Sequence, residues 1–433
     1  MVKKLKKNLF KSKKIDITEG FKNTLQMMEF TDKNLYITGK AGAGKSTLLK
    51  HFVQNTGKNY VIVAPTGVSA INVGGTTIHS FFRFPFGIVK EEDIEYQPDK
   101  RDLFKNLEVL IIDEISMVRV DLLHAVDLAL RKNTGNKKDP FGGVQIIMFG
   151  DLYQLPPIVR TSEEEKYLKD KFGGKYFFYC PAFSDGVLER VELEENFRQK
   201  EDIVFFDLLN NIREKIFTSA DFALLNSRFE PYIHKDPAIV LATTNKIADS
   251  INEERLKEIG EKEFVYGARV EGGFDIKKSP TDEELRLKKG AQIMMIKNDT
   301  EIPRRWVNGS IGTVVALGKS TIMVNINGNE YDVSQAMWKE YHFEYDEEEG
   351  DIVKLPVGSF YQYPLKLAWA VTIHKSQGKT FDRVVIDLGR GAFAHGQTYV
   401  ALSRCTSLLG IYLMRPVRNS DIIVDDEVKV FCG

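Results

Sequence analysis

One stretch constrains the fold more than any other part of this 433-residue chain: Gly39-Lys40-Ala41-Gly42-Ala43-Gly44-Lys45-Ser46-Thr47, a complete phosphate-binding loop of the pattern G-x-x-x-x-G-K-[ST]. Apolar residues at 35–37 predict a buried strand before it, and apolar residues at helical spacing over 48–53 predict a helix after it. In that setting backbone N–H groups and a helix N-terminus can surround phosphates. We therefore predict a nucleotide site in which Lys45 reaches the β- and γ-phosphates and the Ser46 hydroxyl binds Mg²⁺.

Composition limits the partners of the chain. The formal net charge is −1, so any nucleic-acid site must be local. The one basic run is the start of the chain, which we interpret as a solvated tail in preference to a phosphate-binding arm. No apolar run is long enough to span a bilayer, and the three scattered cysteines have no metal-type spacing and suggest a reducing compartment.

Strand-like and helix-like runs alternate in two parts of the chain. Four β-branched runs, at 36–37, 60–63, 109–112 and 144–148, belong to the first part, and three more, at 238–241, 383–386 and 411–414, belong to the second. Such runs fit strands buried on both faces of a parallel sheet. The predicted fold class is α/β, with two doubly wound parallel-sheet domains.

Two stretches interrupt this alternation. Residues 76–105 are aromatic-rich and then charged. Residues 290–361 contain short strands with hairpin signals at Asn308-Gly309 and Asn327-Gly328, which predict a small antiparallel barrel inserted into the second domain.

Acidic and amide side chains follow two predicted strands of the first domain. Asp113 and Glu114 end the run at 109–112, where Asp113 can hold Mg²⁺ and Glu114 can act as the base that polarises an attacking water. Gln154, in the Gly- and Pro-rich stretch 149–157, is expected either to orient water or sense the γ-phosphate, or to be an exposed turn residue.

These segments together resemble the ordered motifs of superfamily-one helicases, and in particular the Pif1 (RecD-like) family of 5′→3′ DNA helicases. The resemblance runs from about residue 17 to 415. It is carried by the phosphate loop, Ala64-Pro65-Thr66-Gly67, Thr77-Ile78-His79-Ser80-Phe81, Asp113-Glu114, the stretch 150–157, the stretch 193–199, the stretch 367–378 and Tyr399 to Arg404.

The family resemblance implies a domain plan. Residues 1–75 and 106–195 correspond to the first RecA-like domain (1A), with 76–105 as a wedge-like insert (1B). Residues 196–289 and 362–433 correspond to the second RecA-like domain (2A), with 290–361 as the inserted barrel (2B).

The resemblance also assigns residues beyond the phosphate loop to ATP. Arg198 and Arg404 are expected to neutralise charge on the γ-phosphoryl group, with Gln154 and Gly378 also at the nucleotide. Because both arginines are assigned to catalysis, losing either is expected to spare binding of single-stranded DNA.

The DNA contacts implied by the family are Pro65, Thr66, Gly67, His79, Phe81, Lys297, Asn298, Thr372, His374 and Lys375. Hydroxyls and single basic groups suit phosphate contact without base readout. Phe81 and Trp369 are interpreted as base-stacking or core residues, and Trp306 as a further barrel contact. The chain departs from the family in one respect, because it lacks the Glu-Gln pair upstream of the phosphate loop whose Gln reads adenine. Gln26 lies closer to the loop than that Gln does, and Phe21 could help to form a base pocket, so no residue is assigned to adenine recognition.

The predicted activity is ATP-dependent translocation on single-stranded DNA, 5′→3′ by resemblance, with unwinding of forked or tailed duplex and of G-quadruplex or R-loop structures. The expected cofactors are ATP and Mg²⁺, and the expected form is a cytoplasmic monomer without a membrane partner, with a nuclear or mitochondrial location left open. Family roles include DNA repair, recombination and telomere maintenance. The alternatives are a RecD-like subunit of a nuclease complex, a nucleotide-switched DNA-binding module and a small-molecule kinase.

Overall fold

A computed structural model describes residues 18–194, 202–229, 238–301, 304–346 and 351–433. The chain forms two compact units. Unit 1 comprises Met1–Leu152, Pro156–Arg198 and Lys339–Gly358, and unit 2 comprises Tyr153–Leu155, Gln199–Trp338 and Ser359–Gly433. Within the described ranges, no helix has the length and apolar character needed to cross a membrane.

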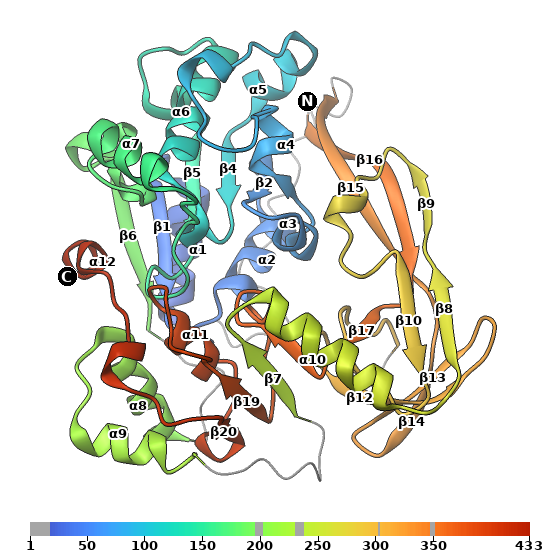
Figure 1. The fold of residues 1–433 in the computed structure, drawn as a ribbon. Coiled ribbons are helices and arrows are strands. Elements are labelled where there is room, and N and C mark those ends of the chain that lie inside the picture. Colours follow the sequence, from blue (N-terminus) through green and yellow to red (C-terminus); the bar gives the residue numbers. More distant parts are fainter. Residues whose placement is uncertain (1–17, 195–201, 230–237, 302–303, 347–350) are drawn as a thin grey trace. The chain divides into compact units, whose positions relative to one another are not determined.

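Unit 1 is built on a six-stranded sheet in the order β3-β2-β4-β5-β1-β6, in which every neighbouring pair is parallel (Figure 1). Its strands are β1 (Asn34–Gly39), β2 (Tyr60–Ala64), β3 (Thr76–Thr77), β4 (Val109–Ile112), β5 (Gln145–Phe149) and β6 (Leu188–Leu193). Central strands β1, β2, β4 and β5 are buried almost throughout, as their β-branched composition predicts. The carboxyl ends of these strands therefore share one edge, where the candidate site residues follow them.

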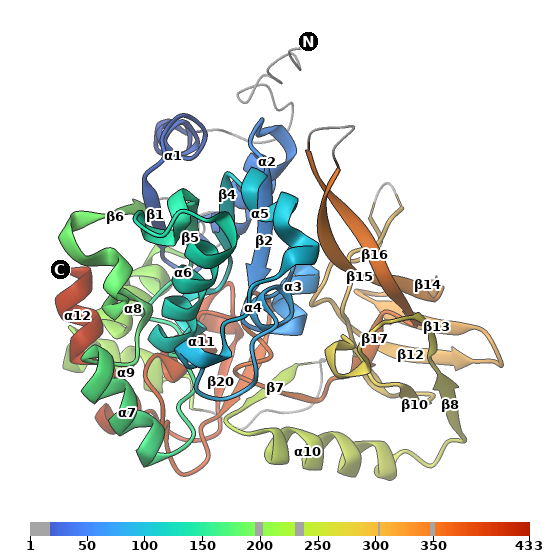
Figure 2. The same ribbon diagram turned by 90° about the horizontal axis from the view of Figure 1, so that it is seen from above.

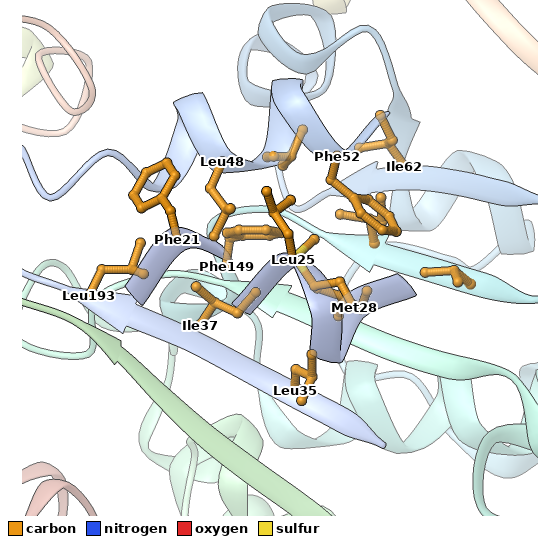
Figure 3. Close-up of a cluster of buried hydrophobic side chains, with 14 of the residues drawn as sticks. Phe21, Leu25, Met28, Leu35, Ile37, Leu48, Phe52, Ile62, Phe149 and Leu193 are labelled. Carbon is orange, nitrogen blue, oxygen red and sulfur yellow. The ribbon is translucent and has the colours of Figure 1, made fainter. Parts of the chain in front are cut away.

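Helices cover both faces of this sheet: α1 and α2 lie on one side and α6 on the other (Figure 2). Phe21 and Leu25 of α1 pack with Leu48 and Phe52 of α2 over Ile37 of β1 (Figure 3). The helices of unit 1 are α1 (Glu19–Phe30), α2 (Lys45–Asn55), α3 (Gly67–Val73), α4 (Ile78–Phe82), α5 (Arg101–Asn106), α6 (Val120–Thr134) and α7 (Ser162–Phe172). This packing fixes the start of α2, and with it the phosphate loop, against the middle of the sheet.

The aromatic-rich insert of unit 1 is a small hydrophobic cluster. Phe81 packs edge-on against Phe82 at 4.8 Å, Phe104 at 5.6 Å and Phe343 at 6.3 Å between ring centroids. Phe343 lies on β15 (Ala336–Asp346), whose outer part belongs to unit 1. The insert thus has its own core, closed by a strand from far along the sequence.

Unit 2 contains a second parallel sheet, in the order β18-β7-β19-β20. Its strands are β7 (Ile239–Ala242), β18 (Ala370–Thr372), β19 (Val384–Asp387) and β20 (Ile411–Leu413). Helix α10 packs on β7 and β18 through Ala248 against Ala242 and Ala370. The helices of unit 2 are α8 (Ile203–Glu214), α9 (Ser219–Asn226), α10 (Asn245–Glu258), α11 (Gln397–Leu402) and α12 (Asp426–Cys432). Two parallel α/β sheets are the architecture that the alternating pattern predicts.

Among the described residues, the inserted antiparallel region extends beyond the expected 290–361, and its strands form three separate sheets. Five strands form an open sheet in the order β14-β13-β12-β11-β17: β11 (Gln292–Met295), β12 (Ile311–Leu317), β13 (Ile322–Ile326), β14 (Asn329–Val333) and β17 (Leu365–Leu367). Other strands are β8 (Glu263–Gly267) paired with β10 (Glu284–Lys288), and β9 (Arg269–Gly272) beside β16 (Asp351–Gln362), which pairs with β15. The stretch Lys339–Gly358 of β15 and β16 belongs to unit 1, not to the second domain as expected. Tyr266, Leu285 and Leu287 share a core with Ile293 and Leu365, so the region extends in both directions. Charged residues alternate with the apolar ones in β10 and flank them in β8, so the sequence pattern does not predict these strands.

Only one of the two predicted hairpin signals is a two-residue turn. Asn327 and Gly328 have φ values of 53° and 84° and directly join β13 to β14. Positive φ at both positions is what a type I′ turn needs. Asn308-Gly309 instead lies shortly before β12, in the longer connection from β11 to β12.

All three cysteines are free thiols. Cys180 and Cys405 are buried, and burial raises their pKa values to about 12 and about 11. Cys432, in α12, is partly exposed.

Candidate nucleotide and DNA sites

The phosphate loop connects the end of β1 to the start of α2. Gly42 and Gly44 have φ values of 89° and 85°, in the left-handed region that favours glycine. Ala41 and Ala43 point into the protein, being 7% and 1% exposed, whereas Ser46 and Thr47 are exposed on the first turn of α2. The loop therefore directs its small side chains inward and presents its backbone and hydroxyl groups outward, as a phosphate site requires.

Lys45 is held by the loop itself. Its Nζ donates hydrogen bonds to the carbonyl oxygens of Gly39 at 2.5 Å and Lys40 at 3.2 Å. These bonds place the ammonium group over the residues that precede α2. A phosphate bound by the loop would meet this charge directly.

Asp113 and Glu114 follow β4 at the same edge of the sheet. Burial raises the pKa of Asp113 to about 6, while the positive charges of Lys45 and Lys50 oppose that shift. Glu114 has a φ of 53° and a ψ of 45°, an unfavourable conformation for a side chain other than glycine, asparagine or aspartate. Strained backbone of this kind concentrates at functional sites, and the observation fits the predicted catalytic role of Glu114.

The predicted Mg²⁺ ligands suit that ion. The Ser46 hydroxyl and the Asp113 carboxylate are oxygen donors, and Mg²⁺ is usually bound through one or two carboxylates together with substrate phosphates. The described residues contain no group of three or more His, Cys, Asp and Glu side chains that could hold a metal without such a phosphate. When bound, the ion would neutralise charge on the β- and γ-phosphates.

Gln154 is a buried residue of unit 2, not an exposed turn residue. It is 7% exposed, and its Oε1 accepts a hydrogen bond from Gln377 Nε2 at 3.1 Å. The neighbouring ring of Tyr153 lies 4.1 Å from the guanidinium carbon of Arg213. The three residues Tyr153–Leu155 thus belong to unit 2 although the chain on both sides of them belongs to unit 1.

Arg404 lies in the interior of unit 2, with an exposed fraction of 1%. Its guanidinium donates to the carbonyl oxygen of Val400 at 2.9 Å, to Ser403 Oγ at 2.8 Å and to the carbonyl oxygens of Ser376 and Lys379 at 3.5 and 3.2 Å. The bonds to Ser376 and Lys379 connect Arg404 to the loop after β18. The sequence does not indicate this structural role of Arg404. Gly378, with a φ of 76°, lies in the same loop, and Arg198 lies outside the described residues.

The candidate DNA contacts of unit 1 differ in accessibility. Thr66 is exposed after β2, beside Pro65 and Gly67, and its Oγ1 accepts a hydrogen bond from the Ser69 N–H at 3.2 Å. His79 stacks on Phe86, with ring centroids 5.2 Å apart, and burial together with Arg119 lowers its pKa, so it is a neutral hydrogen-bonding group near pH 7. Phe86 is 85% exposed.

Phe81 is a core residue, which corrects its assignment to DNA. It is 2% exposed within the aromatic cluster, and Lys100 Nζ lies 4.9 Å from its ring centroid. A ring enclosed in this way has no free face for a base.

The candidate DNA contacts of unit 2 fall into two groups. On the loop after β18, Lys375 is exposed, the Thr372 hydroxyl accepts a hydrogen bond from the Lys375 N–H at 3.2 Å, and burial lowers the pKa of His374. These three residues lie together on one loop, and their contact with DNA stays a prediction.

The second group, in the loop between β11 and β12, has structural partners. Lys297 Nζ donates to the Met337 carbonyl at 2.6 Å, and Asn298 Oδ1 accepts from the Asn308 N–H at 2.7 Å. Trp306 is a core residue, 6% exposed, and Trp369 packs against the same core. Lys297 and Asn298 therefore shape this loop, and the suggested DNA contact of Trp306 does not fit its burial.

Two lysines that the sequence reasoning missed lie beside the loop after β18. Lys366 is on β17 and Lys379 follows Gly378. A signal was present, because Lys366 interrupts an apolar strand-like run, Leu365 to Ala370, where a charge is unusual.

Unit 1 has a phosphate loop and an acidic strand end. Unit 2 has a second parallel sheet, a Thr-His-Lys loop and a buried arginine. Together these features define a P-loop ATPase of the helicase class. Residues 19–217 match the model of the PIF1-like helicase family. The ATP-dependent DNA helicase Pif1 of Bdellovibrio bacteriovorus is 36% identical over 412 residues, which cover 92% of this chain and 88% of that protein. The chain belongs to the Pif1 helicase family, and the resemblance read from the motifs is confirmed.

Solved structures agree with this assignment. A crystal structure of Bacteroides sp Pif1 with ADP-AlF4 has a TM-score of 0.89 at 36% identity, covering 96% of both chains. A structure of Bacteroides Pif1 bound to single-stranded DNA has a TM-score of 0.70 at 37% identity, again covering 96% of both. These likenesses confirm the predicted fold class. The chain spans 58–63% of the length of the vertebrate Pif1 helicases that it matches.

Proposed function

We propose that the protein uses ATP hydrolysis to move 5′→3′ along single-stranded DNA and to unwind forked or tailed duplexes. The observation that carries this proposal is the phosphate loop with Lys45, next to Asp113 and the strained Glu114. Relatives with the same architecture support the DNA part, since Bacteroides Pif1 has been solved both with ADP-AlF4 and with single-stranded DNA.

In this proposal each residue has a separate task. Lys45 binds the β- and γ-phosphates. Ser46 and Asp113 would hold Mg²⁺, which would supply further neutralisation of phosphate charge. Glu114 takes a proton from the attacking water. Hydrolysis depends in addition on Arg404 of unit 2, so that catalysis responds to the loop after β18, whose carbonyl groups Arg404 binds.

The DNA contacts that we propose are Pro65, Thr66, Gly67 and His79 in unit 1, and Thr372, His374 and Lys375 in unit 2. Thr66 and Lys375 are exposed, whereas Thr372 is 4% exposed and lies behind the loop surface. Contacts of this kind bind the backbone and give little base preference. We further propose that the chain works in the cytoplasm and is a monomer in solution, although one related structure describes two coordinating Pif1 helicases at a fork.

Two measurements test the proposal. We expect steady-state ATP hydrolysis to require Mg²⁺ and to rise strongly when single-stranded DNA is added. We expect strand displacement on a duplex with a 5′ tail and none on a matched duplex with a 3′ tail. Displacement only from the 3′ tail would reject the polarity, while nucleotide-dependent DNA binding without hydrolysis would favour a switched binding module.

A further inference from the structure

The five-stranded sheet of unit 2, which contains β11 and β17, packs against the hydrophobic core with only one of its faces. Ile293, Met295 and Leu365 belong to the core. Met294, which lies between the first two and pairs with Lys366 across β11 and β17, faces the opposite way because side chains alternate along a strand. Lys366 therefore lies on the face away from the core.

The loop after β18 brings a second lysine to this face. Lys379 Nζ lies 3.9 Å from Met294 Sδ and 3.4 Å from Asn308 Oδ1. Arg404 fixes the backbone here, since it binds the Lys379 carbonyl oxygen at 3.2 Å. Lys375, on the same loop, is close enough to act electrostatically on Lys366. We call Lys366, Lys375 and Lys379 the lysine cluster.

The lysine cluster has no anionic partner among the described residues. No ion pair joins its ammonium groups to a carboxylate of the described residues, and Asp282 and Asp249 act on Lys366 only electrostatically, at longer range. Burial, reinforced by the mutual repulsion of the lysines, lowers the pKa of Lys366 to about 8 and that of Lys379 to about 7.

Such an arrangement is costly for the folded protein. Charges that are partly removed from water are normally paired, and an unpaired one destabilises the native state. A gain elsewhere can explain why the chain keeps these lysines, and an anion that enters the cluster supplies that gain by neutralising the charges.

We propose that the lysine cluster binds a phosphodiester group of single-stranded DNA, at a position adjacent to Thr372 and His374. The proposal rests on the proposed function, because it takes the loop after β18 to be a DNA-binding loop. Lys366 and Lys379 are half-buried and add two cations to the exposed Lys375. Lysine binds phosphate as a point charge without reading a base, which suits a protein that must pass over any sequence.

The test compares Lys366→Met and Lys379→Gln with the matched control Lys289→Gln, which removes an exposed lysine in the turn between β10 and β11. Affinity for a labelled oligothymidine is measured by fluorescence anisotropy at several salt concentrations. We expect each cluster variant to bind about tenfold more weakly, with a plot of log K against log salt that is shallower by about 0.7 for each lost phosphate contact. The control should match the wild type in both respects.

Thermal melting distinguishes a DNA-binding role of the lysines from a structural one, because loss of a structural residue would lower the Tm. Lys366→Met keeps the aliphatic stem and removes an unpaired charge, so its Tm should equal or exceed that of the wild type. A large fall in Tm for both cluster variants, or an unchanged salt slope in both, would overturn the proposal.

Further arms separate DNA phosphate from other phosphate sources. Basal ATP hydrolysis without DNA should be unchanged in Lys366→Met, and millimolar inorganic phosphate should not compete with the oligomer. Competition by inorganic phosphate at that level, or a changed KM for ATP, would assign the cluster to free phosphate or nucleotide and overturn the DNA assignment. A wild-type protein without salt-dependent DNA binding would reject the proposed function as well, whereas normal wild-type binding with unchanged variants rejects only this inference.

Discussion

The phosphate loop of unit 1 and the loop after β18 in unit 2 are both recognisable in the sequence, but they use their charged residues in opposite ways. Around the phosphate loop, Lys45 and the exposed Ser46 lie on the surface that a nucleotide would contact. In unit 2, Arg404 is 1% exposed and holds backbone carbonyl groups. A charged residue can thus act on a ligand directly or through the loop that it supports, and only the structure distinguishes the two.

The largest expected effect tests direct action. We expect Glu114→Gln to lower DNA-stimulated ATP hydrolysis by about 10²–10⁴-fold, because the general base is lost while the shape is kept. Binding of a fluorescent ATP analogue should be retained, whereas Lys45→Ala should weaken it. Hydrolysis by Glu114→Gln at a rate near that of the wild type would show that Glu114 is not the base.

Arg404→Ala tests whether a charged residue acts through the loop that it supports. Hydrolysis should fall by about 10³-fold if the guanidinium also stabilises the transition state. The sequence predicts that DNA binding is spared, but the structure predicts weaker binding, since the carbonyl groups of Ser376 and Lys379 lose their donor. Comparing DNA affinity of Arg404→Ala and Arg404→Lys without nucleotide decides between the two, and equal affinity to the wild type would support the sequence-based expectation.

A smaller effect is expected in the pH dependence of DNA affinity, which should depend on the lysines of unit 2. Lys366 and Lys379 have lowered pKa values of about 8 and about 7, and a bound phosphate favours their charged forms. Affinity should therefore be highest below about pH 7 and fall as the pH rises toward 9. Burial lowers the pKa of His374 below its ordinary value, so His374 does not contribute to a change between pH 7 and pH 9. Anisotropy titrations at constant ionic strength should show this fall in the wild type and a smaller one in Lys379→Gln.

The smallest effect on function is expected at Phe81. Phe81→Leu should reduce the stability of unit 1 by about 1–2 kcal/mol through imperfect packing of the aromatic cluster. Its affinity for single-stranded DNA should not change, because the ring is enclosed. A loss of DNA affinity without a change in thermal stability would return Phe81 to the list of DNA contacts.

Much of the fold could be predicted from the sequence because the central strands are buried on both faces. Continuous apolar runs such as those of β4 and β5 specify parallel strands, and the phosphate loop fixes their connection to α2. The edges of the antiparallel region could not be predicted, since β8 and β10 alternate apolar with charged residues and resemble surface segments. Their partners, such as Ile293 and Leu365, lie far along the chain.

Residue types at the site were predictable and their surroundings were not. The pattern identifies Asp113 and Glu114, but not the φ of 53° that strains Glu114. Gln154 is similar, since its bond to Gln377 joins residues 223 positions apart. Lys366 and Lys379 needed the pairing of β11 with β17 before they could be associated with one another.

The state of the three thiols offers a practical route into single-molecule work. Cys180 and Cys405 are buried and, with their raised pKa values, carry almost no reactive thiolate at neutral pH, whereas Cys432 is accessible near the C-terminus. A maleimide dye should consequently label the wild-type chain at one place without any cysteine being removed. A fluorophore attached there would report movement along an immobilised strand while every residue discussed above stays native.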